Sequence, residues 1–150
     1  MKTFSEYRNS QENISIKESA APQYTMFPKD KKELKKMIEK EIAKHGTEAD
    51  LNHIDVSNIK DFSDVFYGSS FNGDISKWDV SNAINMKEMF FKSEFSGDIS
   101  GWDVSNVETM SSMFQNAKAF NCDLSGWEVS KVTDTSYMFC YAESFNGDVS

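Results

Sequence analysis

Acidic residues recur along the chain at a fixed spacing, and carboxylates held in register are candidate ligands for a metal ion. One set follows intervals of 24, 24, 25 and 25 residues, and a second set lies five residues further on: Asp50, Asp74, Asp98, Asp123 and Asp148, then Asp55, Asp79, Asp103 and Glu128. If the repeats stack about 4.8 Å apart, neighbouring carboxylates repel each other by roughly 0.9 kcal/mol in water. Bound Ca²⁺ would offset this repulsion, because Ca²⁺ takes several oxygen ligands.

These carboxylates also have a structural interpretation, in which each accepts hydrogen bonds from the N–H groups of its own turn. We favour this interpretation, because one carboxylate per coil supplies few ligands. The repeat also lacks the dense Gly-Gly-x-Gly-x-Asp spacing of calcium-binding β-rolls. We therefore expect neither a metal site nor a cofactor.

The other chemically reactive residues do not form a recognisable catalytic set. Cys122 takes the glycine position of a Phe-Asn-Gly-Asp turn and Cys140 lies elsewhere in its repeat, so a disulfide between them is not favoured and free thiols are expected. His45 and His53 are far along the chain from both cysteines. No Ser-His-Asp arrangement, phosphate loop or zinc spacing is supported, so we expect a non-enzymatic protein without catalytic residues.

The aspartates mark the start of a sequence repeat. The text DISKWDVSNAINMKEMF begins at Asp74, and DISGWDVSNVETMSSMF begins at Asp98. The chain therefore divides into an N-terminal arm or anchor, a capping helix with its turn, and a set of repeats. The boundaries are 1–27, 28–49 and 50–150, the last comprising 50–73, 74–97, 98–122, 123–147 and a stub at 148–150.

Each repeat combines two local patterns. Trp78 and Val80 are two residues apart, as on one face of a strand, whereas Met86, Met89 and Phe90 have the spacing of one side of a helical turn. One such unit cannot bury its apolar side alone, so we expect the units to stack into a shared core. The tryptophans should then form successive rungs: Trp78, Trp102 and Trp127.

The repeated text F-N-G-D-I-S-x-W-D-V-S-N-V-x-x-M-x-x-M-F resembles the BspA-like leucine-rich repeat family, bacterial surface proteins with a repeat of about 25 residues. The resemblance covers residues 50–150. It implies an α/β fold, specifically a leucine-rich-repeat-type solenoid of short strand–turn–helix coils with an N-terminal capping helix. It also implies a non-enzymatic role in surface display, adhesion or recognition, and the family has no catalytic residues to carry over.

The segment before the repeats predicts an amphipathic helix over 31–45. Asp30 and Glu33 form a capping box and Gly46 suits the helix end. Its lysines could contact a membrane surface or an anionic partner, but the acids interleaved among them favour the solvated face of a capping helix. Residues 1–27 could wrap their own coils or dock into a larger assembly, and we favour docking.

Charge and hydropathy exclude several classes of function. The chain has 16 basic and 24 acidic residues, a net charge of −8, which argues against nucleic acid as a partner. No apolar run is long enough to span a membrane, and the N-terminus has no apolar signal-peptide region. We expect display on a bacterial cell surface or a phage particle without a secretory signal, the alternative being a cytoplasmic protein.

We expect the contact surface at the repeated outward positions of the predicted strands, namely Lys77, Asp79, Asp103 and Glu128. The partner would be a protein or a surface glycan. The last coil should leave an uncovered apolar edge that meets a partner or another copy, unless the natural polypeptide continues, and this edge is formed by Trp127, Val129, Met138 and Phe139. With the N-terminal arm, this edge would support a homo-oligomer or a larger assembly. The alternative function is an intracellular protein-interaction module.

Overall fold

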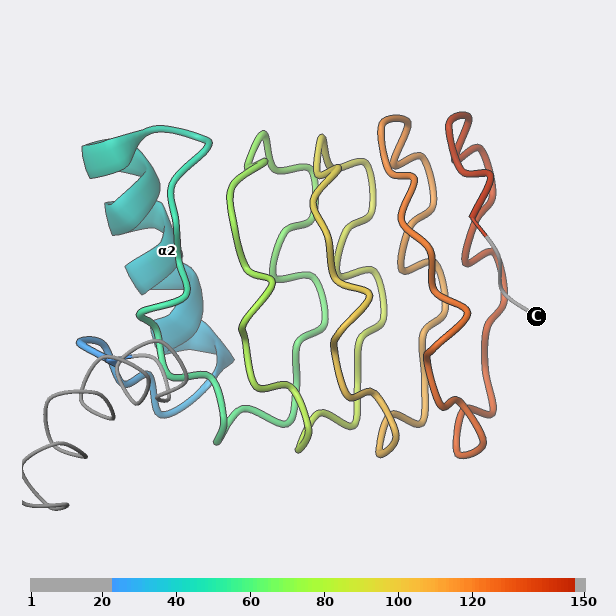
Figure 1. The fold of residues 1–150 in the computed structure, drawn as a ribbon, viewed down its shortest axis with the longest axis horizontal. Helices are drawn as coiled ribbons and strands as arrows, with labels where there is room; N and C mark the ends of the chain where they lie inside the picture. Colours follow the sequence, from blue (N-terminus) through green and yellow to red (C-terminus); the bar gives the residue numbers. More distant parts are fainter. Residues whose placement is uncertain (1–22, 148–150) are drawn as a thin grey trace, which may run out of the picture.

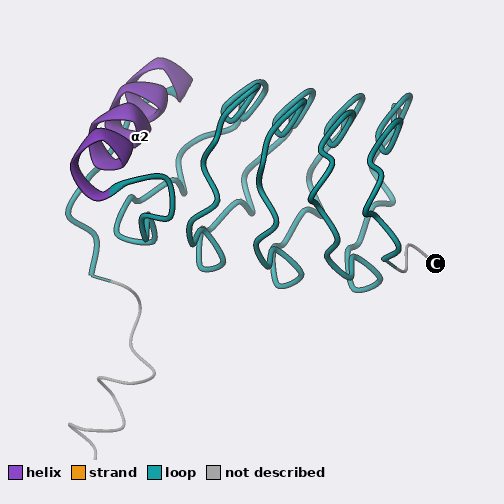
Figure 2. Cartoon of the chain, turned by 90° about the horizontal axis from the view of Figure 1, so that it is seen from above, coloured by secondary structure: helices purple, strands orange, loops and turns teal. Residues whose placement is uncertain are grey.

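The structure is a computed structural model, and it describes residues 23–147. One helix, α2 (Lys31–His45), stands at the start of the described chain, and four coils follow it in sequence order away from the helix (Figures 1 and 2). Pairing between coils consists of isolated parallel bridges, which are Asp50–Asp74, Asp61–Asn85, Asn85–Thr109 and Thr109–Asp134. Most of the predicted arm, residues 1–22, and the predicted stub at 148–150 lie outside the described residues.

Helix α2 begins and ends where the local sequence predicts. The Asp30 carboxylate accepts a hydrogen bond from the Glu33 N–H at 2.9 Å, and the Glu33 carboxylate accepts one from the Lys29 N–H at 2.8 Å. Gly46 ends the helix with a φ of 91°, in the region that favours glycine. The predicted helix over 31–45 is confirmed, and its apolar side joins the core through Leu34 and Ile38.

The prediction of an α/β, leucine-rich-repeat-type solenoid with strand–turn–helix coils is wrong. Within residues 23–147 the coils contain turns and single bridges, with no sheet and no helix after α2. The predicted strand at Trp78–Val80 does not form, because turns at Asp74 and Asp79 interrupt pairing after one residue. The bridges that remain hold neighbouring coils in register without building a ladder.

The predicted helical turn at Met86–Phe90 does not form either. Glu88 has a φ of 56°, in the left-handed region, which breaks a right-handed helix. The N–H groups that would bond four residues back instead reach the next coil: Met86 to Thr109 O, Glu88 to Ser111 O, Phe90 to Met113 O and Lys92 to Gln115 O. The spacing of the apolar residues therefore fits a buried side both in a helical turn and in the coil that actually forms.

The tryptophans form the predicted rungs. The rings of Trp78 and Trp102 lie 6.4 Å apart and within 6° of parallel. Each indole Nε1 also donates to a carbonyl of the preceding coil, with the same partner position each time: Trp78 to Leu51, Trp102 to Ile75 and Trp127 to Ile99. Because these side chains are buried, the bond satisfies the indole N–H inside the core.

Two columns of phenylalanines run beside the tryptophans along the whole stack. Successive centroids are 5.4–5.6 Å apart in one column and 6.0–6.4 Å apart in the other, the columns being Phe66, Phe90, Phe114 and Phe139, then Phe71, Phe95, Phe120 and Phe145. Within a coil the two rings also stack, at 4.7 Å for Phe90 and Phe95. The core is therefore continuous from the first coil to the last.

The third coil holds one residue more than the first two without disturbing these columns. The bridge partners Asn85 and Thr109 are 24 residues apart, whereas Thr109 and Asp134 are 25 apart. Lys118 and Ala119 at the corner of this coil are exposed, while Ala117 and Phe120 on either side are buried. The extra residue is therefore accommodated at the surface.

Candidate interaction face

Every coil turns at three acidic or polar side chains that accept hydrogen bonds from the residue two positions later. In the first column the Asp74 carboxylate accepts from Ser76 N–H at 2.9 Å and from its hydroxyl at 2.7 Å. Asp98 accepts from Ser100 in the same way. The third column, at the bridges, repeats this geometry at Asp61, Asn85 and Asp134. The hydrogen-bonded interpretation of the aspartates is therefore confirmed for these residues.

The second column contains three of the four predicted interaction residues. Asp79, Asp103 and Glu128 occupy the same position in successive coils and are all exposed. One carboxylate oxygen of each accepts from the serine two residues on, at 2.9–3.0 Å from the backbone nitrogen. This contact fixes the direction of the carboxylates. Lys77, the fourth residue, is exposed two positions before Asp79, and its N–H donates to the Asn52 side chain at 2.9 Å.

Turn hydrogen bonds stabilise the charged form of Asp98 and Asp103. Those from the Ser105 hydroxyl and N–H lower the pKa of Asp103, and those from Ser100 lower the pKa of Asp98. These hydrogen bonds therefore favour the ionised form of Asp98 and Asp103. Among residues 23–147, no group of three or more His, Cys, Asp or Glu side chains is placed to hold a metal ion.

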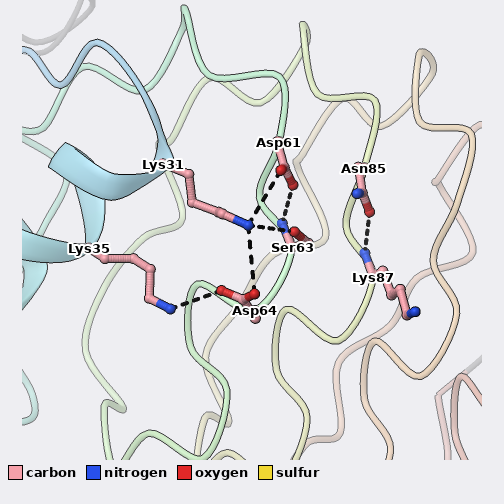
Figure 3. A network of polar contacts seen from close by, with 7 residues as sticks. All are labelled: Lys31, Lys35, Asp61, Ser63, Asp64, Asn85 and Lys87. Carbon is pink, nitrogen blue, oxygen red and sulfur yellow. Dashed lines mark hydrogen bonds and ion pairs between the residues drawn. The ribbon is translucent and has the colours of Figure 1, made fainter.

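The helix and the first coil are joined by a cluster of charges (Figure 3). Lys31 Nζ lies 3.4 Å from Asp61 Oδ2 and 3.6 Å from Asp64 Oδ2, and it donates to Ser63 Oγ at 2.8 Å. Lys35 Nζ donates to Asp64 Oδ1 at 2.9 Å. Burial opposes the charge of Asp61, but the bonds from Ser63 and the charge of Lys31 outweigh it and lower its pKa. Two lysines of the basic helix thus face the acidic coil.

Contacts between distant positions add features that sequence reasoning missed. Glu41 on α2 lies 3.0 Å from His53 Nε2 in the first coil, and this contact helps to hold the helix on the stack. Tyr67, which is exposed, stacks on Phe91 of the next coil with centroids 4.8 Å apart. The only sequence signal for this contact was the spacing of 24 residues between the two aromatic side chains, which equals one repeat. Neither side chain belongs to the apolar patterns that define the repeat.

The last coil presents an apolar groove of about 360 Å³. It is lined by Met110, Leu124, Trp127, Val129, Thr135, Met138 and Phe139, which include the whole predicted edge. Val129 is 46% exposed, whereas its counterparts Val80 and Val104 in the preceding coils are fully buried. Within residues 23–147, no further coil covers this groove.

The two cysteines are both free. Cys122 is buried and its thiol lies 3.6 Å from Asp98 Oδ1. Burial raises the pKa of this thiol, and the neighbouring Asp98 charge acts in the same direction. The Cys122 thiol is thus held in its protonated form and is a poor nucleophile at neutral pH.

Comparisons with known proteins give one result. A family model described as "Mycoplasma protein of unknown function, DUF285" matches residues 32–150. No curated protein and no solved structure matches the chain. The assignment to the BspA-like leucine-rich repeat family is therefore wrong, because the repeats match a different family model and form coils without strands or helices.

Proposed function

Because the chain belongs to DUF285, a family of Mycoplasma proteins of unknown function, we propose a function from the geometry of its surface: a non-enzymatic scaffold for display and recognition. Its partner is a protein or a surface glycan that contacts the column formed by Asp79, Asp103 and Glu128, together with Lys77. The observation that carries this proposal is that these three acids are exposed and held in one direction on successive coils.

A rigid array suits recognition because little conformational freedom is lost when the partner binds. Each acid of the column uses one oxygen within its own turn, which leaves the other oxygen for a donor on the partner. Residues 50–150 hold 6 basic and 16 acidic side chains, so a partner that presents positive charge or hydroxyl donors is complementary to this surface.

The geometry supplies no argument for catalysis. The lowered carboxylate pKa values follow from turn hydrogen bonds, and the perturbed Cys122 thiol is buried against Asp98. The described residues contain no helix that is long and apolar enough to cross a membrane. The proposed display on a cell surface or a phage particle depends on the predicted arm, most of which lies outside the described residues.

The proposal is tested by binding of the labelled chain to intact cells and to purified particles of its source. We expect the triple variant D79N/D103N/E128Q to bind about tenfold more weakly, because its side chains keep an acceptor oxygen for the turn but lose three charges. The control E39Q/E48Q/E94Q loses the same charge from exposed positions outside the column and should bind as the parent does.

Cell fractionation separates display from the alternative function. Recovery of the chain at the surface or on particles supports display. Recovery only in the cytosol, as a free monomer, would contradict display and favour an intracellular interaction module. Equal binding of the column variant and its control would show that the column is not the contact surface.

A further inference from the structure

One corner of each coil is joined to the preceding coil by a backbone hydrogen bond, except between the second and third coils. An N–H of the later coil donates to a carbonyl of the earlier coil at 3.0 Å and 3.2 Å, in the pairs Glu94–Ser69 and Ser144–Lys118. The equivalent bond between the second and third coils would join the Ala119 N–H to the Ser93 carbonyl. Among residues 23–147, neither of these two groups has a hydrogen-bond partner.

The missing bond follows from a change in the length of the corner. Phe90 and Phe95 are five residues apart in the second coil, whereas Phe114 and Phe120 are six residues apart in the third coil. All four rings nevertheless keep their places in the aromatic columns. The first coil has the shorter corner and the fourth has the longer one, so the mismatch within the described coils falls between the second and the third.

A hollow of about 450 Å³ lies at this unclosed corner, and Ser93 and Ala119 both line it. Ser93 is only 3% exposed, so its carbonyl belongs to the interior wall of the hollow. A buried carbonyl without a donor is unfavourable, and a molecule that brings a donor to it forms the hydrogen bond that the corner lacks. The half-buried side chain of Asn116 also lines the hollow and offers an amide donor and acceptor.

The charges around the hollow are balanced. Lys92, Glu94 and Lys118 line it, and the Lys118 ammonium lies 3.3 Å from the Glu143 carboxylate. Two ammonium groups and two carboxylates therefore surround the hollow, and they favour a neutral ligand over an ion. Lys92 Nζ also lies 5.4 Å from the centre of the Phe91 ring, so an aromatic side chain adjoins the hollow. Such a combination of polar groups and aromatic surface is typical of sites for small polar molecules.

We propose that this hollow binds an N-acetylated amino sugar of a glycan. The acetamido group is a secondary amide, in which N–H and C=O point in opposite directions. It can therefore donate to the Ser93 carbonyl and accept from the Ala119 N–H, which supplies both partners that the corner lacks. A ring hydroxyl pairs with the Asn116 side chain. This inference goes beyond the proposed function and does not rest on it, because the hollow lies outside the column that begins at Asp79.

The test is titration of the full chain with N,N′,N″-triacetylchitotriose, followed by calorimetry and NMR. Cellotriose is the matched probe, because it has the same linkage and carries a hydroxyl in place of each acetamido group. We expect chitotriose to bind with a Kd below about 1 mM and cellotriose to bind about tenfold more weakly. Chitotriose should also slow exchange of the Ala119 amide about tenfold, because this N–H gains an acceptor.

The first matched pair of variants is N116G and S112G. Asn116 and Ser112 lie in the same coil with φ of 58° and 54°, so glycine relieves the same backbone strain at both positions. Only Asn116 lines the hollow. N116G should weaken chitotriose binding about fivefold, whereas S112G should bind as the parent does.

The second pair is A119P and A119G, of which only A119P removes the N–H donor. A119P should weaken binding about tenfold and A119G should not. A chitotriose Kd above about 1 mM, equal binding of cellotriose, spectral changes away from this corner or equal effects within the first pair would each overturn the inference. A hollow that holds only water gives the first of these results. None of the measurements uses cells, so failure of the proposed function would leave them unchanged.

Discussion

The Cα of Gly73 lies directly against the backbone carbonyl oxygen of Ala49, and a Cβ at this position would overlap that oxygen. The same hydrogen-bonded region brings the Asp74 N–H to the Ala49 carbonyl at 3.1 Å. The backbone before the first coil and the end of that coil can approach this closely only because residue 73 has no side chain. The register of the first coil on the segment before it therefore depends on a single residue type.

Replacement of Gly73 by alanine should lower the free energy of unfolding by on the order of 2–4 kcal/mol, because the two backbone segments must separate to admit the methyl group. Urea denaturation followed by tryptophan fluorescence measures this change. Gly101→Ala is the control, since a Cβ there meets nothing within 4 Å and the substitution should be neutral or slightly stabilising. Equal midpoints for the two variants would contradict the close approach.

Lys92→Gly should stabilise the protein by about 0.5–1 kcal/mol. Lys92 has a φ of 54° and Gly68 occupies the same position of the preceding coil with a φ of 62°, so glycine relieves the strain of a left-handed lysine and loses part of that gain in chain entropy. The reverse change, Gly68→Ala, should destabilise, although a Cβ there meets nothing within 4 Å. Thermal melts of both variants measure the effect, and a shift of the same sign in both would refute it.

Trp102→Phe should cost about 1–3 kcal/mol, since it removes a buried hydrogen bond to Ile75 and leaves space between two packed rungs. Trp127→Phe removes the equivalent bond to Ile99 but affects a ring that borders the open groove. We expect a smaller loss for this second variant in chemical denaturation. A larger loss for Trp127→Phe than for Trp102→Phe would mean that the last rung is the better packed one.

Stability should fall as pH drops below about 4, through the range in which aspartates titrate. The pKa values of Asp74, Asp98 and Asp103 are lowered in the folded protein, chiefly by hydrogen bonds from the serine two residues later. A lowered folded-state pKa contributes stability that is present above the unfolded-state pKa and is lost as pH falls through the folded-state pKa. Denaturation midpoints at pH 7 and pH 3 measure this loss.

The matched variants for this experiment are S76A and S100A, which remove the hydroxyl donors to Asp74 and Asp98. Each should reduce the difference in stability between pH 7 and pH 3. S70A changes an exposed serine that no described contact joins to a turn carboxylate, and it should keep the parent profile. An unchanged profile in S76A and S100A would show that the turns do not set these pKa values.

Local signals predicted correctly what is determined locally. The bounds of α2 follow from Asp30, Glu33 and Gly46, because capping depends on neighbours in the sequence. The repeat period predicted the alignment of Trp78 on Trp102, because identical units bury their apolar sides only against one another. The expectation that the repeated aspartates accept hydrogen bonds from N–H groups of their own turns was likewise correct at Asp50, Asp74, Asp98 and Asp123.

The conformation inside each coil could not be obtained in this way. Met86, Met89 and Phe90 have helical spacing, but their backbone donors bond to the next coil or within a turn, and Glu88 between them is left-handed. The spacing of apolar residues predicts which side of a segment is buried, but it does not predict which carbonyl accepts each backbone N–H. The contacts of Glu41 with His53 and of Tyr67 with Phe91 also depend on how the coils pack, so no pattern among neighbouring residues predicts them.

Because the corner at Lys118 and Ala119 is exposed, the number of residues in it can change without altering the packing of the core. One additional residue enters there while Phe95 and Phe120 keep their place in the aromatic column, with centroids 6.4 Å apart. A hollow of about 450 Å³ adjoins this corner, bounded by Lys92, Glu94 and Asn116 among others. A foreign peptide inserted between Lys118 and Ala119 would therefore lie on the surface and leave the spacing of the coils unchanged. This corner is thus a suitable site for inserting an epitope or an affinity tag.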